Sequence, residues 1–173
     1  MALENIKTSE TPHSAPPPMD EFQIAGILEK LIKFGLFHAT DKPLKQPLLS
    51  GRPFFMTDDK DIASDFGDLL YDVDIEPGNI LDAPEAMKRG ILDLSTYSVT
   101  PEYEELLQEI GRSSHFPDLA FSPEFKSRMD KEGIDYLLDP KSMSQPTPFS
   151  EPEYFNELVS MFPEKSIRSV RRR

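Results

Sequence analysis

The stretch from Gly35 to Asp82 constrains the fold most, because it strings together short apolar segments with different periodicities. Residues 36–40 (LFHAT) and 54–56 (FFM) are short runs typical of strands. Residues 58–69 carry apolar side chains at helical spacing behind an acidic first turn, which predicts an amphipathic helix. Residues 70–75 alternate apolar and acidic positions, as a strand buried on one face does. Strands and helices mixed in this way predict an α+β fold.

Helices are predicted on both sides of this stretch. Residues 20–34 have apolar side chains at three- and four-residue spacings, and Gly35 is placed to end that helix. Residues 82–90, 100–111 and 122–133 each begin with a capping Asp, Thr or Ser, continue with an early proline and end on glycine. One further strand is predicted at residues 134–138, and two short apolar segments follow at 158–162 and 167–170.

The length and apolar content fit a single domain with its own core, since the chain has 173 residues of which 38% are hydrophobic. Residues 1–18 are polar, hold four prolines and show no apolar periodicity. The predicted organisation is a disordered Pro-rich leader over residues 1–18, an α+β domain over 19–170 and a frayed, solvated basic tail over 171–173.

Charge and cysteine content exclude several classes of function. Thirty-one acidic and 19 basic side chains give a formal charge of -12, which disfavours nucleic acid and anionic membranes and favours a protein or small-molecule partner. The absence of cysteine excludes disulfides, thiolate metal sites and a cysteine nucleophile. No apolar run approaches the roughly 20 residues of a membrane span, and the first 20 residues lack a secretory signal. Localisation stays open, because specialised secretion routes recognise other targeting signals.

Several motifs, taken in order, resemble the ADP-ribosyltransferase superfamily of the histidine class. The run LFHAT is similar to the opening strand of that family, with His38 on its histidine and Ala39 where glycine is usual. The run GRPFFMTDDKDIASDF is similar to the next strand and helix, and it aligns Phe55 and Phe66 with two aromatic positions. The runs YDVDIEPGNILD, KEGIDYLLD and NELVSMFPEKSIRSV follow in the family's order, so the resemblance spans about residues 36–170.

The resemblance implies a small split antiparallel sheet that forms an NAD cleft and is flanked by helices. It implies transfer of one ADP-ribose from NAD, without a metal, to a macromolecular target, in the first place a protein, by a bacterial or phage effector or toxin. Breaking the bond between nicotinamide and ribose builds an oxocarbenium-like sugar, which a nearby carboxylate stabilises. The implied roles are the catalytic carboxylate for Glu157, ribose contacts for His38 and Thr40, stacking on nicotinamide for Phe55 or Phe66, and the small residue facing the nicotinamide amide for Ala63.

Some alternatives stay open on the sequence. Both motif aromatics, often tyrosine in the family, are phenylalanine here, and Phe155 stands where arginine-modifying members carry Glu or Gln. Glu153 competes with Glu157, because the run EPE at 151–153 imitates the two-glutamate spacing. Glu157 is preferred because it directly precedes an apolar segment, whereas a proline fits poorly inside a ladder. The competing functions are a non-catalytic interaction module with the same fold, and an acidic adaptor or inhibitor with no nucleotide site.

Overall fold

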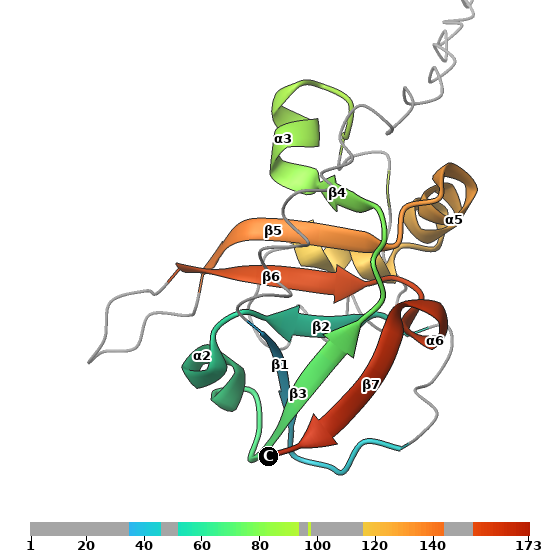
Figure 1. Cartoon of the computed structure of the whole chain (residues 1–173). Helices are drawn as coiled ribbons and strands as arrows, with labels where there is room; N and C mark the ends of the chain where they lie inside the picture. Colours follow the sequence, from blue (N-terminus) through green and yellow to red (C-terminus); the bar gives the residue numbers. More distant parts are fainter. Residues whose placement is uncertain (1–34, 46–51, 94–96, 98–115, 144–153) are drawn as a thin grey trace, which may run out of the picture.

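In the part of the chain that the structure describes, the protein has an α+β fold built on a seven-stranded sheet, in the order β4-β5-β6-β2-β1-β3-β7 (Figure 1). The computed structural model describes residues 35–45, 52–93, 97, 116–143 and 154–173. Strands β4 and β5 pair in parallel, and every other neighbouring pair is antiparallel. The strands are β1 (Leu36–Thr40), β2 (Phe54–Thr57), β3 (Leu69–Ile75), β4 (Ile80–Asp82), β5 (Tyr136–Met143), β6 (Tyr154–Ser160) and β7 (Ile167–Arg172).

Short helices join the strands, and their ends follow the predicted capping chemistry. In α3 (Ala83–Lys88), Asp82 accepts a hydrogen bond from the backbone N–H of Glu85 at 3.0 Å. In α5 (Pro123–Glu132), Ser122 caps the first turn, and Gly133 ends the helix with a left-handed φ of 70°. The other helices within the described residues are α2 (Lys60–Ser64), the 3-10 helix η3 (Phe116–Phe121) and α6 (Pro163–Ser166).

Several predicted boundaries are wrong by a few residues. The helix predicted over 58–69 is only α2, because Asp59 accepts the N–H groups of Asp61 and Ile62 and so caps a later start, while β3 already begins at Leu69. The strand predicted over 134–138 begins two residues later. The segment predicted at 158–162 is β6, which begins at residue 154 and therefore has Glu157 inside it.

Other predictions lie outside the described residues: the leader at 1–18, the helix at 20–34 and the helix at 100–111. No helix within the described residues is both long enough and apolar enough to cross a membrane.

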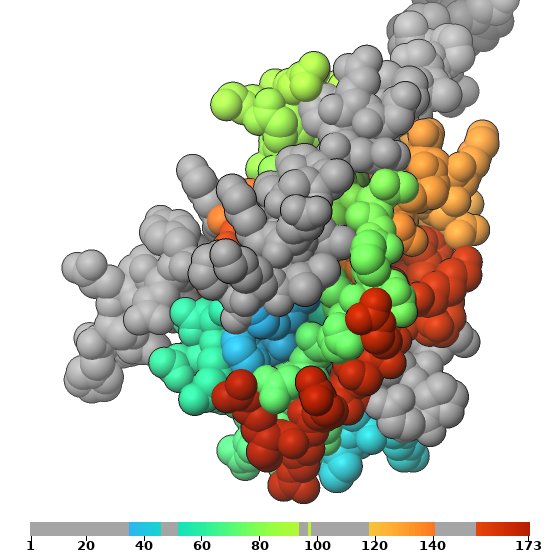
Figure 2. All heavy atoms as spheres, in the orientation of Figure 1, coloured from blue at the N-terminus to red at the C-terminus, as the bar shows by residue number. Residues whose placement is uncertain are grey.

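The prediction of a frayed tail over residues 171–173 is wrong, because the chain continues there along the sheet. Arg171 and Arg172 belong to β7, where they lie opposite Asp72 and Tyr71 of β3. Arg173 donates from its backbone to the carbonyl of Leu70 and from Nε to Asp72, at 3.0 and 2.7 Å. The three side chains are exposed, as predicted, and the atoms of β7 (red) lie on the surface in Figure 2. Backbone pairing with β3 and the ion pair between Arg173 and Asp72 hold this segment.

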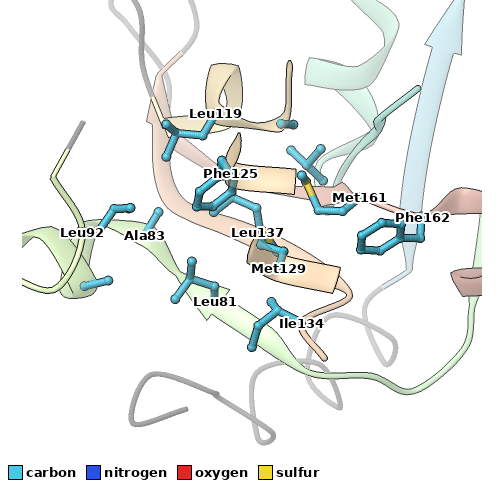
Figure 3. Close-up of a cluster of buried hydrophobic side chains, with 13 residues drawn as sticks. Leu81, Ala83, Leu92, Leu119, Phe125, Met129, Ile134, Leu137, Met161 and Phe162 are labelled. Atoms are coloured by element: carbon cyan, nitrogen blue, oxygen red, sulfur yellow. The ribbon is translucent and has the colours of Figure 1, made fainter. Parts of the chain in front are cut away.

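One hydrophobic cluster fills the space between the β4–β5–β6 half of the sheet and the helices beside it (Figure 3). Phe125 and Met129 of α5 are fully buried there against Leu137 of β5 and Val159 of β6. Both helical residues lie on one face of α5, as their spacing of four requires. This cluster anchors the strand that carries Glu157.

A second cluster lies on the other face of the sheet and unites its two halves. It contains Leu36 and Val73 from β1 and β3, together with Phe54, Met56 and Leu158 from β2 and β6. Strands β1 and β3 are joined through five residue pairs, whereas β1 and β2 share the single pair Phe37–Thr57. The sheet therefore opens between β1 and β2, and Figure 1 shows β3 and β7 running at a steep angle to β5 and β6.

Replacing Tyr136 by Phe is expected to lower the free energy of unfolding by about 1–3 kcal/mol. The single O–H of the buried phenol lies between the carbonyl oxygens of Glu76 and Ser166, at 2.5 and 2.9 Å, and so ties the end of β3 to α6. Urea denaturation measures the change. Tyr71→Phe is the control, since that hydroxyl only accepts the N–H of Leu44 at 3.2 Å. An equal loss in both variants would contradict the assignment.

Candidate functional site

His38 lies where β1 and β2 separate. Its side chain links the two strands at a point where their backbones no longer pair. Beyond the Phe37–Thr57 pair, Nδ1 of His38 hydrogen-bonds the backbone carbonyl of Phe55 at 2.9 Å. The ring also packs on Phe54, with 4.4 Å between centroids. Because a carbonyl oxygen only accepts, Nδ1 carries the proton, and in the neutral ring Nε2 is left as an acceptor. The histidine is thus oriented by β2 with one acceptor atom available for a hydroxyl.

Burial lowers the pKa of His38 below its ordinary value of 6.5, although the hydrogen bond to the Phe55 carbonyl acts in the opposite direction. The ring is therefore neutral at pH 7, and its Nε2 lone pair is retained under physiological conditions. A neutral imidazole suits contact with a neutral hydroxyl such as that of a ribose.

A pH dependence of stability follows from that lowered pKa. The unfolded chain takes up a proton near pH 6.5, before the folded protein does, so His38 removes stability as pH falls below about 6.5. We expect wild type to lose more stability than His38→Gln between pH 7 and pH 5. Urea denaturation at both pH values gives the difference. Equal losses would show that His38 titrates normally.

Gly67 fixes the turn after α2 against the end of β1. A Cβ atom on Gly67 would lie 2.3 Å from the carbonyl carbon of Thr40 and 2.7 Å from the backbone nitrogen of Asp41. The two backbones therefore touch, and only glycine fits. This approach places the turn that carries Phe66 next to Thr40 in space, although the two residues are distant in the sequence. Phe66 is 53% exposed, which singles it out among the large apolar side chains of the described residues.

Phe55 lies on β2 and Ala63 on α2, and their surroundings differ. Ala63 is buried on α2, the helix that contacts β1 and β2. Phe55 is half-buried and already stacks on Phe121 of η3, with 5.6 Å between centroids and 22° between planes. Of the two aromatics predicted to stack on nicotinamide, Phe66 is exposed, whereas Phe55 is half-buried and packs on η3.

Glu157 lies one strand beyond β2, in the middle of β6. Thr57 pairs with Phe37 on one side and with Glu157 on the other, and Glu157 in turn lies opposite Asp139 of β5. Adjacent strands are about 4.8 Å apart, so β1 and β6 are separated by about 10 Å at this point. His38 and Glu157 are thus held on the two strands that flank β2, close to the place where the sheet opens.

The register also limits how one ligand could touch both side chains. Residues opposite one another on neighbouring strands point to the same face. Phe37, Thr57 and Glu157 therefore share a face, and His38, one residue further along β1, belongs to the other. A ligand that contacts both His38 and Glu157 must lie across the opening between β1 and β2.

A polar clamp beside Glu157 was not predicted from the sequence, in which Asp58 belongs to the acidic first turn of the helix predicted over 58–69. Asp58 accepts from the backbone N–H of Asn156 at 3.2 Å and from its side-chain Nδ2 at 2.6 Å. Asp59 caps α2 instead, and its own N–H donates to Thr57 Oγ1. The clamp joins the start of α2 to β6 next to Glu157. Thr57, Asp58 and Asp59 are all residue types that cap helices, so the sequence does not show which of them caps α2 and which binds β6.

In the described part of the chain, no group of three or more His, Asp or Glu side chains is placed to bind a metal ion. A scan of protein-family models, a search of curated proteins and a search of solved structures each found no match to this chain. Glu153, the competing glutamate, lies outside the described residues.

Proposed function

We propose that this chain is an NAD-dependent mono-ADP-ribosyltransferase that transfers ADP-ribose to a macromolecular target, in the first place a protein. The observation that carries the proposal is the arrangement of His38 and Glu157 on the strands flanking β2, at the opening of the sheet. An exposed aromatic side chain, Phe66, follows α2 beside the end of β1. A nucleotide-binding transferase of this type needs a ribose contact, a carboxylate and a stacking surface, and these three residues supply them.

The division of labour follows from the chemistry of each group. Cleavage of the bond between nicotinamide and ribose develops positive charge on the sugar, and the Glu157 carboxylate stabilises it and orients the ribose hydroxyls. Nε2 of His38 accepts from a hydroxyl of the other ribose. Phe66 stacks on the nicotinamide ring, a contact worth about 1 kcal/mol beyond burial. The leaving group is neutral nicotinamide, so no general acid is needed for its departure.

Two residues then have supporting roles in the proposed site. Ala63 is buried on α2, and its small side chain lets the helix pack close to β1. Thr40 follows His38 by two residues on β1 and so shares its face, where its hydroxyl can support the same ribose. The proposed NAD cleft is the opening between β1 and β2, bordered by α2.

Thermal denaturation with and without millimolar NAD tests the nucleotide site. Wild type is expected to melt higher with NAD, because the ligand binds only the folded state. His38→Ala is expected to lose most of that shift, measured against its own melting temperature without ligand, since ring removal also costs packing against Phe54. Lys131→Ala, an exposed change on α5, is the control and should keep the full shift. No shift for folded wild type would reject the proposal.

A further inference from the structure

Strand β7 forms one edge of the sheet, and within the described residues it pairs with β3 alone. An edge strand presents a row of backbone N–H and C=O groups that no neighbouring strand uses. In Figure 2 the atoms of β7 (red) lie uncovered across the lower part of the molecule. This edge is separate from the proposed nucleotide site, since β3 lies between β7 and β1.

The register identifies which backbone groups face outward. Arg173 donates to the carbonyl of Leu70, and the pairs Arg171–Asp72 and Ser169–Asp74 follow at intervals of two. In an antiparallel ladder, hydrogen-bonded and non-bonded pairs alternate along the strand. The N–H and C=O groups of Val170 and Arg172 therefore point away from β3. They offer two donors and two acceptors to an additional strand.

The charge on this edge is opposite to that of the whole chain. Four arginines occur within residues 168–173 of a chain whose net charge is -12. Arg168 is held by Glu76 at 2.9 Å and Arg173 by Asp72 at 2.7 Å. Arg171 and Arg172 are exposed, and neither forms an ion pair within the part of the chain that the structure describes. Because they are consecutive on a strand, they point to opposite faces of the sheet.

We propose that β7 is the docking site for an extended acidic segment of a partner protein, which adds to the sheet as an eighth strand. The backbone of the segment pairs with Val170 and Arg172, and two adjacent acidic side chains reach Arg171 on one face and Arg172 on the other. A second copy of this chain fits poorly, since two β7 edges would bring arginines together. Nucleic acid fits poorly as well, because a polynucleotide has no peptide N–H and C=O groups to pair with those of Val170 and Arg172.

Fluorescence anisotropy with a labelled six-residue peptide, TVEEVT, tests the docking site in the full chain without NAD. We expect saturable binding that weakens with salt and is absent for TVKKVT. The double variant Arg171→Glu, Arg172→Glu should weaken binding at least tenfold. The matched pair Lys88→Glu, Lys131→Glu, on α3 and α5, makes the same charge change away from the edge and should bind as wild type does.

The backbone part of the proposal is tested on the peptide, so that no variant needs to fold. N-methylation of alternate peptide nitrogens removes strand pairing and leaves the two carboxylates, and it should also weaken binding at least tenfold. Equal binding of the methylated peptide would show charge attraction without strand addition and would overturn the proposal. Failure of wild type to bind TVEEVT, or equal binding by the Arg171/Arg172 variant, would do so too. In either case NAD binding, measured separately, is unaffected.

Discussion

Glu157→Gln is expected to slow the release of nicotinamide from NAD by about a hundredfold or more, while NAD binding stays nearly intact. The carboxylate acts on charge that develops only as the bond breaks, so its loss appears in the rate and hardly in the affinity. Glutamine keeps the shape of the side chain and the position in β6 between Thr57 and Asp139. Nicotinamide release by chromatography gives the rate, and calorimetric titration gives the affinity.

Two glutamate changes serve as controls for that result. Glu164→Gln, at an exposed position on α6, should leave the rate unchanged. Glu153→Gln tests the competing assignment, because Glu153 lies four residues before Glu157. Loss of activity on changing Glu153 alone would move the catalytic role to that residue and keep the enzyme class. An active protein indifferent to both changes would remove the carboxylate from the mechanism.

Gly67→Ala is expected to destabilise the protein by about 3 kcal/mol or more, which corresponds to roughly 10 °C in melting temperature. The added Cβ would lie 2.3 and 2.5 Å from backbone atoms of Thr40, and backbone cannot move aside as a flexible side chain can. To relieve the clash, the turn that carries Phe66 must move away from β1. We therefore expect the variant to lose NAD affinity in addition to stability. Thermal and urea denaturation measure the first effect, and calorimetry the second.

Gly133→Ala separates steric clash from backbone strain. Gly133 has a left-handed φ of 70°, but a Cβ atom there meets nothing within 4 Å. Its substitution should cost only about 1–2 kcal/mol. If Gly67→Ala costs no more than Gly133→Ala, the contact between the α2 turn and β1 is looser than described, and Phe66 is not fixed beside Thr40.

Local chemistry predicted the elements that carry their own signals. The Asp82 and Ser122 caps, the glycine after α5 and the alternation of β3 are each written into a few consecutive residues, and the structure has them as predicted. The α+β class was confirmed for the same reason. The predicted boundaries of helices and strands were wrong where tertiary contacts decide them. The last arginines are polar and gave no strand signal, and only the pairing of their backbone with β3 makes Arg171 and Arg172 part of β7.

The candidate site was less accessible to sequence reasoning, because its geometry depends on contacts distant in the chain. Nothing local indicates that β1 and β2 share one residue pair, or that the His38 ring binds the Phe55 carbonyl where they separate. The stacking of Phe55 on Phe121 and the clamp between Asp58 and Asn156 likewise join segments 66 and 98 residues apart. Their roles in chemistry remain predictions, as do those of Glu157 and Phe66.

NAD consumption by the wild-type protein tests the central claim most directly. The protein is incubated with a cell lysate and NAD labelled in its adenylate phosphate, and the products are separated on a denaturing gel while free nicotinamide is measured. We predict a labelled macromolecular band with release of nicotinamide, both strongly reduced in Glu157→Gln. A folded protein that binds NAD by calorimetry and yet releases no nicotinamide and labels nothing would contradict transfer and favour a non-catalytic interaction module.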